Sequence, residues 1–445
     1  MAIHPIEYRY GTPEMKYVWS EESKLNKLLQ VEAALAKAEA DVGMIPIKAA
    51  KKIAESINSV KLGRVNEIED EINHDMMAVV LALSEQCGDA EKWVHFGATS
   101  NDILDTQVAL QIRDSIKLLR QKAISVRDAL VNKAEEHKNT VCVGRTHGQI
   151  GVPTTYGLRF AVWASEMDRH LIRLDELEPR AAVGQMTGAV GTQAAFGQDG
   201  IEIQRRVMEY LDLGSVEVST QIIQRDRHAE FVMWMANTAT TLDKICVELR
   251  SLQRSEIAEV EESFGKKQVG SSTMPHKRNP IKSEQVCGLA RIIRGMVEPE
   301  LLNNTLWDER DLTNSSSERI IFPETCVLTD HILKLTEGIV TNLRFYPENI
   351  KRNLNLLNGL NMGEAVMIEL AKRGVGRQEA HEIVRVCAME AHETGRHMKD
   401  VLMSKVEVTQ YISPEEIEEI MDPEKYIGTA VEQVEAVVER IRNKL

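Results

Sequence analysis

The feature that most constrains the fold is the length of the uninterrupted helical runs. Residues Gln107–Lys138 contain neither glycine nor proline, and apolar residues recur along them at helical spacing. Residues Ser215–Phe264 also lack glycine and proline, and much of that run has the same spacing. Ordinary globular helices run about 8–20 residues, so these runs predict a helix bundle or a coiled coil. The apolar stripe of the first run comprises Val108, Ile112, Ile116, Leu119, Ile124, Leu130 and Ala134.

Three further runs with helical spacing complete the central part of the chain. They span residues 154–178, 281–298 and 324–343. With the two longest runs they predict a bundle of about five long helices. On both sides of this bundle the helical segments are shorter, and after residue 347 glycines and prolines interrupt them repeatedly.

These runs predict an all-α fold in three helical domains. No alternation of apolar and polar residues is long enough to indicate a sheet, and the chain has no internal repeat. We expect an N-terminal helical domain over residues 1–104, a central long-helix bundle over residues 105–346 and a C-terminal helical domain over residues 347–445.

The composition favours helix packing and an anionic small-molecule ligand over nucleic acid. Aromatic residues make up 4% of the chain and hydrophobic residues 43%, so aliphatic side chains must fill the core. A β-sandwich would need more aromatic and β-branched residues. The formal net charge of −14 argues against a general nucleic-acid binder, which carries a basic face. Local arginine clusters can still attract an anion into a cleft.

The six cysteines are far apart and form no Cys-x-x-Cys pair, which predicts free buried thiols in a reducing cytoplasm. The N-terminus lacks the apolar core of a signal peptide. No stretch approaches the ~18 uninterrupted apolar residues of a membrane span. We therefore expect a cytoplasmic protein that does not cross a membrane. The cysteines are Cys87, Cys142, Cys246, Cys287, Cys326 and Cys387.

No metal site and no cofactor is expected. The chain contains no cofactor-binding motif. His392 and His397 are five residues apart, whereas a helical zinc motif places its two histidines four apart on one face.

The segment Gly270–Pro280, with the sequence GSSTMPHKRNP, has the most chemical content. Its composition predicts a mobile loop, and catalytic lids are often such loops. Ser271 offers a hydroxyl, Lys277 a cation and Asn279 an amide. The helix expected after Pro280 would place backbone N–H groups nearby, and these also favour an anion. Taken alone, the composition is equally typical of a surface turn.

Two other polar segments stand at the ends of long helical runs. Gly144–Gln149 contains His147, and an imidazole suits proton transfer near neutral pH. His95–Asp102 contains Thr99 and Ser100, which are preferred N-cap residues and also suit an anion at a helix N-terminus. Alone, the first reads as an incidental histidine in a turn, and the second as a helix cap.

Together these three segments resemble the signature regions of the fumarase/aspartase superfamily. In that superfamily the first serine of the loop is the general base, and the lysine and asparagine hold a substrate carboxylate. The resemblance implies these roles for Ser271, Lys277 and Asn279.

The same resemblance assigns the two remaining segments. It implies that His147 is the general acid or its close partner, and that Glu284 pairs with it. It also implies that Thr99 and Ser100 bind a carboxylate. We include His95, which opens that segment, among the expected substrate-binding residues.

Several weaker segments point to one family within the superfamily. These segments are Arg9–Tyr10, Asn73–Asp75, Ser219–Gln221 with Arg225–His228, and Trp307–Arg319. Each alone is typical of a charged surface turn, but in this order they resemble the adenylosuccinate lyase family over nearly the whole chain. The resemblance implies that His74 is a second catalytic histidine and that Asp75 and Asn73 lie at the nucleotide. Asn73 and Asp308 stand where that family often has a basic residue and a histidine.

The resemblance also implies further nucleotide contacts. It gives Gln221 a contact to the succinyl or base portion. Ser315 and Arg319 would share one face of a helix, because they are four residues apart. The alternative is that Arg319 pairs on the surface with an acidic neighbour such as Glu318 or Asp311. The residues implied to contact the phosphate and ribose are Arg9, Tyr10, Arg310, Ser315 and Arg319.

The implied reaction is a β-elimination that releases fumarate from adenylosuccinate and from the succinyl-aminoimidazole-carboxamide ribotide of purine nucleotide biosynthesis. Ser271 would remove the proton next to a carboxylate, and Lys277 and Asn279 would stabilise the developing charge. His147, supported by Glu284 and His74, would protonate the leaving nitrogen. One such acid or base contributes typically ~10²–10⁴-fold in rate.

Two alternatives stay open at this point. A carboxymuconate cycloisomerase of the same superfamily shares a nearly identical loop but need not bind a phosphate. A non-catalytic helical scaffold is the alternative from another class, and the intact set of Ser271, His147, Lys277 and Glu284 argues against it. The resemblance further implies a homotetramer whose sites draw on three subunits.

Overall fold

A computed structural model describes residues 3–265, 273–274 and 276–443. The described residues are mostly helical, which confirms the all-α prediction. They form two compact units, defined by contacts between residues. Unit 1 comprises residues 1–124, 169–243 and 286–334, and unit 2 comprises residues 125–168, 244–285 and 335–445. The division into three domains at residues 104 and 346 stays a prediction.

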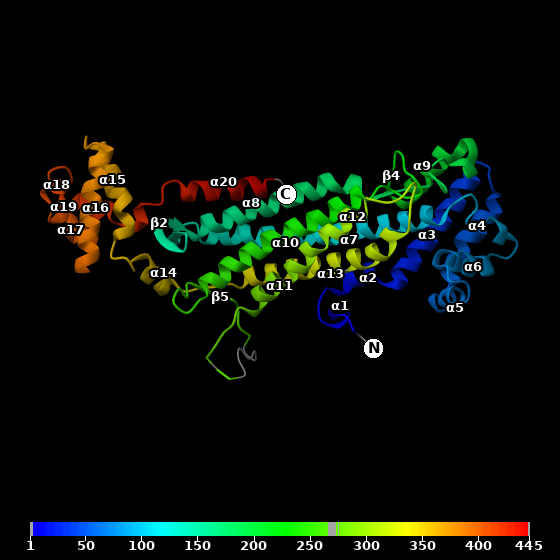
Figure 1. The fold of residues 1–445 in the computed structure, drawn as a ribbon, viewed down its shortest axis with the longest axis horizontal. Helices are drawn as coiled ribbons and strands as arrows, with labels where there is room; N and C mark the ends of the chain where they lie inside the picture. The colour runs from blue at the N-terminus through cyan, green and yellow to red at the C-terminus, as the bar shows by residue number, and fades with distance from the viewer. Residues whose placement is uncertain (1–2, 266–272, 275, 444–445) are drawn as a thin grey trace. The chain divides into compact units, whose positions relative to one another are not determined.

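Five long helices correspond to the five predicted runs, and each contributes residues to both units. They are α7 (Ser100–Glu136), α8 (Tyr156–Ala181), α10 (Asp226–Leu252), α11 (Ile281–Gly295) and α13 (Thr313–Thr341) (Figure 1). The predicted apolar stripe of α7 is confirmed at its centre, because Ile112, Ile116 and Leu119 are fully buried.

Polar contacts within unit 1 connect these helices in pairs. Arg120 of α7 donates to Glu178 of α8 at 2.6 Å. The indole N–H of Trp234 on α10 donates to the carbonyl of His170 on α8 at 2.8 Å. On α11, Arg294 donates to Asp243 of α10 at 2.9 Å. The helices therefore pack as a bundle with specific pairings between apolar faces.

The rest of unit 1 is a group of shorter helices around a shared apolar core. Leu29, Leu35 and Ile53 are among its buried residues. Ser20 caps the longest of these helices by accepting from the backbone N–H of Ser23. The helices of this core are α3 (Glu21–Asp41), α4 (Ile47–Ser56), α5 (Leu62–Ile72), α6 (Asp75–Cys87) and α9 (Gly200–Leu211). Unit 1 also contains the short helices α1 (Pro5–Tyr8), α2 (Pro13–Val18) and α12 (Val297–Leu302), which lie outside this core.

The rest of unit 2 combines two small sheets with a C-terminal group of helices that has its own apolar core. Leu370, Cys387 and Leu402 are buried in that core. The strands are β1 (Val141–Thr146), β2 (Gln149–Thr155), β5 (Val260–Glu261) and β6 (Arg344–Phe345). The helices are α14 (Pro347–Leu354), α15 (Gly363–Lys372), α16 (Arg377–Thr394), α17 (Met398–Met403), α18 (Val406–Thr409), α19 (Pro414–Ile420) and α20 (Ala430–Arg442).

The prediction that the chain builds no sheet was wrong, although the sheets are small. β1 and β2 form an antiparallel hairpin, β5 and β6 pair antiparallel, and β3 (Val183–Gly184) pairs parallel with β4 (Gly214–Ser215) of unit 1. The sequence did not predict the hairpin because a register shift between Val143 and Arg145, together with Pro153, breaks the alternation of apolar and polar residues. Short 3-10 helices complete the chain: η1 (Ile57–Ser59), η2 (Gly88–Trp93), η3 (Ala194–Asp199), η4 (Leu360–Met362) and η5 (Pro423–Lys425).

Two predicted helix boundaries were also wrong. The run from residue 215 is helical only from Asp226, because the preceding residues form the β4 strand and an irregular connection that carries Gln221. The run predicted from residue 324 begins at Thr313 instead, and Pro323 lies inside the helix. A proline usually ends a helix because it lacks an amide N–H, but here buried packing on both sides maintains it.

Two other expectations can be compared with the structure. All six cysteines are free and buried, as predicted. Among the described residues, no helix combines the length and apolar character that a membrane span requires.

The start of α8 makes a close backbone approach that requires glycine. A Cβ on Gly157 would lie 2.4 Å from the Cα of Lys138 and 2.6 Å from the carbonyl of Ala134. We expect Gly157→Ala to lower the free energy of unfolding by about 1–3 kcal/mol, because backbone atoms must move. In Gly63→Ala, on α5, the new methyl meets nothing within 4 Å, so this control should be neutral or slightly stabilising. Urea denaturation of both variants measures the difference. Equal stability would show that the backbone adjusts without cost.

Candidate active site

Unit 1 contains a cleft of about 300 Å³ that gathers four of the predicted site residues. Asp75 begins α6, Arg310 precedes α13, and Ser315 and Arg319 lie one helical turn apart on α13. These residues are far apart in sequence, so their convergence is a result of the fold. The cleft also contains Arg225, and it therefore holds three arginines.

Arg319 is held by a partner that the sequence did not indicate. Its guanidinium donates to the carboxylate of Asp75 at 2.6 Å. The alternative pairing with Glu318 or Asp311 is not the one observed. Because the Arg319 side chain is 59% exposed, this ion pair fixes a cation at the cleft while leaving it accessible.

Arg310, which lines this cleft, contacts Gln221. The guanidinium of Arg310 donates to the side-chain oxygen of Gln221 at 3.3 Å. Its Nε–H is buried and has no partner among the described residues. Burial lowers the pKa of Arg310, and the nearby charge of Arg225 lowers it further. A cation with an unused donor beside a cleft is suited to bind an anion.

A buried ion cluster supports the floor of this cleft. Arg225 is 4% exposed and donates to both oxygens of Asp105 on α7, at 2.8 and 2.9 Å. It also donates to both oxygens of Glu318 on α13, at 2.8 and 3.2 Å. Burial alone would raise the pKa of Glu318, but the charge of Arg225 outweighs it and lowers that pKa to about 2.

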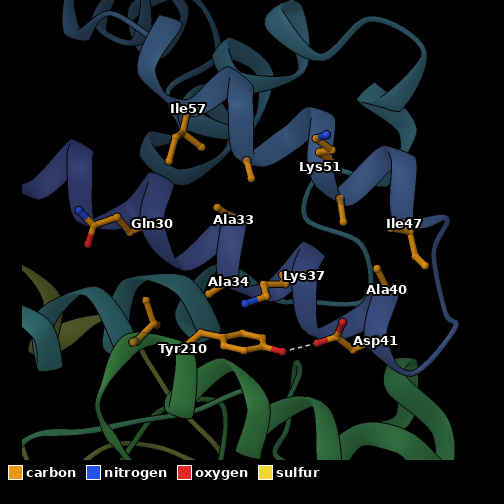
Figure 2. Close-up of a pocket in the computed structure, with 13 residues that line it drawn as sticks. Gln30, Ala33, Ala34, Lys37, Ala40, Asp41, Ile47, Lys51, Ile57 and Tyr210 are labelled. Carbon is orange, nitrogen blue, oxygen red and sulfur yellow. Dashed lines mark hydrogen bonds between the residues drawn. The ribbon is translucent and has the colours of Figure 1, made fainter.

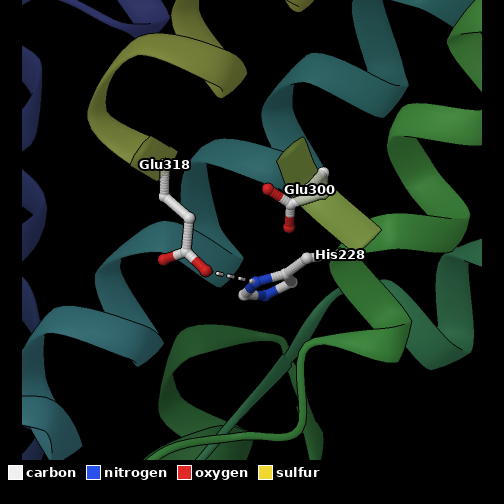
Figure 3. Close-up of side chains that lie close together, drawn as sticks. All are labelled: His228, Glu300 and Glu318. Carbon is white, nitrogen blue, oxygen red and sulfur yellow. Dashed lines mark ion pairs between the residues drawn. The ribbon is translucent and has the colours of Figure 1, made fainter. Parts of the chain in front are cut away.

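His228, Glu300 and Glu318 lie close together beside this cluster (Figure 3). Their possible ligand atoms all lie within 4.8 Å of one another. The two oxygens of Glu318 already accept from Arg225, and one also accepts from Asn314 at 3.0 Å. Burial and the charge of Glu318 raise the pKa of Glu300 to about 8. A neutral carboxyl and a carboxylate saturated by a guanidinium suit a hydrogen-bonded network better than a cation.

His74 and Asn73 lie at the junction of α5 and α6. The Nδ1 atom of His74 accepts from the backbone N–H of Met77 at 3.3 Å and caps α6. This leaves Nε2 toward solvent, and about half of the side chain is exposed. Asn73 ends α5 in the left-handed conformation, with φ of 54°, which asparagine tolerates better than most residues.

The segment with Thr99 and Ser100 begins α7 as predicted. Asp102 accepts from the backbone N–H of Thr99 at 2.9 Å and from that of Thr187 at 2.8 Å, so it joins the helix start to a second loop. His95 is largely buried, and its imidazole contacts Glu32 at 2.7 Å. Burial opposes a charged imidazole, but Glu32 outweighs it and raises the pKa of His95. Sequence reasoning missed Asp102 and Glu32 as partners.

Arg9 and Tyr10 do not line this cleft. They follow α1, and the ring of Tyr10 lies 5.4 Å from that of His331. A larger cavity of about 570 Å³ lies elsewhere in unit 1, between α3, α4 and α9 (Figure 2). Its walls are mostly alanine and isoleucine, with Tyr210 hydrogen-bonded to Asp41 at one edge. None of the predicted site residues lines it.

Unit 2 holds the remaining predicted catalytic residues. His147 is exposed in the turn of the β1–β2 hairpin, with a left-handed φ of 55°. Lys277 and Asn279 precede α11, and Glu284 is exposed in the first turn of α11. Ser271 lies outside the described residues. The other predicted site residues therefore form two sets, one in each unit.

Comparisons with known proteins identify the class. Residues 7–295 match a family model described as "Lyase", and residues 359–437 match one described as "Adenylosuccinate lyase C-terminus". The helical bundle and these matches define a lyase of the fumarase/aspartase superfamily.

Curated relatives identify the family. The adenylosuccinate lyase of Methanocaldococcus jannaschii is 58% identical over 100% of this chain and 97% of its own length. That of Methanothermobacter thermautotrophicus is 57% identical over 99% of each chain. The chain belongs to the adenylosuccinate lyase family.

Solved structures confirm the fold. A 3-carboxy-cis,cis-muconate lactonizing enzyme from Pseudomonas putida matches with a TM-score of 0.90 over 99% of each chain, at 32% identity. Its fold is therefore shared, but its sequence is much less similar than those of the adenylosuccinate lyases. The cycloisomerase alternative is not favoured.

Glu300 generates a pH prediction. In the folded protein its pKa is about 8, against 4.5 for a free glutamate. Between these values the unfolded chain ionises while the folded protein stays protonated, so stability falls as pH rises. We expect the stability of the wild type to fall relative to Glu300→Gln between pH about 5 and about 8, with a slope approaching ~1.4 kcal/mol per pH unit. Urea unfolding at a series of pH values measures the free energy of unfolding of both proteins. If this free energy had the same pH dependence in both, Glu300 would not be neutral in the folded protein.

Proposed function

We propose that this chain is an adenylosuccinate lyase that eliminates fumarate from adenylosuccinate, giving AMP, and from succinyl-aminoimidazole-carboxamide ribotide. Its membership of the family supports this reaction and its place in purine nucleotide biosynthesis. The structural observation that carries it is the unit 1 cleft, where Asp75, Arg310, Ser315 and Arg319 meet. We expect a cytoplasmic enzyme that binds a small nucleotide and needs neither a cofactor nor a metal.

The cleft supplies the groups that a nucleotide phosphate requires. Arg310 and Arg319 offer planar donor forks, and Ser315 offers a hydroxyl. The ion pair with Asp75 keeps Arg319 in place before substrate arrives. Because the phosphate is remote from the bond that breaks, its binding energy can position the reacting carbon. Gln221, beside Arg310, would contact the succinyl or base portion, and Asn73, Arg9 and Tyr10 would complete the nucleotide contacts.

The chemistry requires an acid and a base on opposite sides of the substrate. Ser271 would remove the proton next to a carboxylate, and Lys277 with Asn279 would stabilise the charge that develops. The electron pair left by that proton then forms the carbon–carbon double bond of fumarate, and the electrons of the breaking C–N bond leave with the nitrogen. His147, with Glu284 and His74 in support, would protonate the leaving nitrogen. Thr99, Ser100 and His95 would lie at the second carboxylate.

Arg319 provides the test of the nucleotide assignment. We expect Arg319→Leu to weaken product inhibition by AMP about tenfold to a hundredfold, because a charge-assisted bond is lost. Inhibition by fumarate should change less than about twofold. Arg205→Leu, which removes an exposed arginine paired with glutamates on α9, is the matched control. Fumarate release, followed by absorbance with each succinyl nucleotide, measures both constants.

Two results would overturn this function. Failure of the wild type to release fumarate from either nucleotide would exclude the lyase reaction. Unchanged AMP inhibition in the Arg319 variant would separate the cleft from phosphate binding.

We further propose a homotetramer whose active sites combine residues of three subunits. The resemblance to the family supports this assembly, because the signature segments come from distant parts of the chain: Thr99 and Ser100 belong to unit 1, whereas His147 belongs to unit 2. Mixing inactive His147→Gln and Ser271→Ala proteins should restore part of the activity, because some mixed sites would receive both intact residues. The mass measured by sedimentation should correspond to four chains. No recovery after verified subunit exchange would indicate that both residues come from one chain.

A further inference from the structure

One short segment of unit 2 contacts three parts of the proposed catalytic machinery. We call residues Glu259–Glu262, with the sequence Glu-Val-Glu-Glu, the acidic bracket. Its middle residues form β5, which pairs with β6. Each of its three carboxylates holds a different segment, and none of the three has a role in the mechanism described above.

The first carboxylate holds the hairpin that carries His147. Glu259 is fully buried and accepts from the guanidinium of Arg145 at 2.6 Å. It also accepts from the hydroxyl of Tyr156 and from the amide of Asn353 at 2.9 Å. Arg145 and Tyr156 lie at the two ends of the hairpin region, so Glu259 fixes the strand that leads to His147.

The second carboxylate holds the residue after Lys277. Glu261 accepts from the guanidinium of Arg278 at 2.8 Å and from the hydroxyl of Tyr346 at 2.9 Å. The carbonyl of Arg278 accepts from the side-chain amide of Gln253 at 3.1 Å. Arg278, between Lys277 and Asn279, is therefore held through both its side chain and its backbone carbonyl.

The third carboxylate caps the helix that carries Glu284. Glu262 is 6% exposed. It accepts from the backbone N–H of Ser283 at 2.7 Å, from the hydroxyl of Ser283, and from the backbone N–H of Lys282 at 3.3 Å. These amides belong to the first turn of α11, which has no intrahelical partners for them. Glu262 therefore fixes where α11 starts and how its first turn is directed.

The bracket itself is anchored from the C-terminal side of unit 2. The backbone N–H of Tyr346 donates to the carbonyl of Glu259 at 3.0 Å. The backbone N–H of Glu262 donates to the side chain of Gln253 at 3.0 Å. Asn353, on α14, donates to the carbonyl of Ile257 as well as to Glu259. A segment held at both ends can transmit a fixed geometry to what it binds.

We propose that the acidic bracket is the positioning element that sets the relative placement of His147, the Lys277–Asn279 segment and Glu284. This rests on the proposed function, because it concerns the same reaction. An acceptor oxygen is needed at each position because burial of an unpaired donor is costly. In Glu259 and in Glu262, one oxygen accepts from two donors. General acid–base steps require placement within a fraction of an ångström, and about 1 Å of misplacement can cost roughly 10²-fold in rate.

The test separates positioning from substrate binding. We expect Glu262→Ala to lower kcat about tenfold to a hundredfold, while the inhibition constant for AMP changes less than about twofold. Glu262→Gln, which keeps an acceptor oxygen in the same place, should recover most of the loss. The control is Asp168→Asn, which changes another buried carboxylate of unit 2, paired with Arg440 at 2.5 Å. It should leave kcat within about twofold of the wild type.

If Glu262→Ala is unable to fold, a double-mutant cycle on the ion pair of Glu261 and Arg278 tests the same proposal. Glu261→Ala, Arg278→Ala and the double variant should show similar losses of kcat, because either change breaks the same contact. If the losses of kcat in the two single variants added up in the double variant, the contact between Glu261 and Arg278 would not be what positions this segment. A folded Glu262→Ala enzyme with wild-type kcat, or with an equal loss of AMP binding, would also overturn the proposal. A wild type without fumarate release would instead overturn the proposed function.

Discussion

The buried guanidinium of Arg225 is the interaction on which the nucleotide cleft depends. It joins Asp105 of α7 to Glu318 of α13 through four hydrogen bonds. Removing a charge from water is expensive, and only full pairing makes it tolerable. Two carboxylates and one guanidinium carry a net charge of minus one, and the nearby guanidinium of Arg310, which lines the cleft, offsets that charge. The floor of the cleft is therefore rigid because its charges constrain one another. Burial and the charge of Glu318 raise the pKa of the neighbouring Glu300 to about 8, so this carboxyl is mostly neutral at pH 7.

Four of the eight described non-glycine residues with left-handed φ lie in segments where the sequence indicated chemistry. The non-glycine residues with left-handed φ among the described residues include Asn73, His95, His147 and Asp308. Such residues usually persist only where the surroundings impose them, and they concentrate at functional sites. Asn73 and Asp308 are also two positions at which the sequence resemblance implies a departure from residues common in the family. Asparagine and aspartate are the residue types that adopt this conformation most readily, so local geometry is a sufficient reason for both.

The sequence predicted the helices well because a long apolar period is a local signal. It predicted α7 and α8 closely, and it placed Asp75, Arg310, Ser315 and Arg319 in one functional group by resemblance. It could not predict that Arg319 pairs with Asp75, because the two are 244 residues apart. It also missed the β1–β2 hairpin, whose strands are short and contain a bulge. Buried carboxylates such as Glu259 gave no sign, because in the sequence they resemble solvated acids next to a charged loop. What sequence alone omits is the set of long-range polar contacts, since a packed core only exists once the chain has folded.

The two compact units differ in the electrostatic problem that each solves. In unit 1, cations must wait for an anionic ligand, so carboxylates hold Arg225 and Arg319 in advance. In unit 2, the proposed mechanism requires that the groups that exchange protons stay accessible, and His147 and Glu284 are exposed. The carboxylates of Glu259, Glu261 and Glu262 do not contact these side chains directly. They bind the backbone and the neighbouring residues instead. This arrangement keeps the reacting side chains unpaired while their main chain is fixed, which satisfies the two requirements of acid–base catalysis at once. It also explains why Glu259 and Glu262 are buried although the residues they position are not.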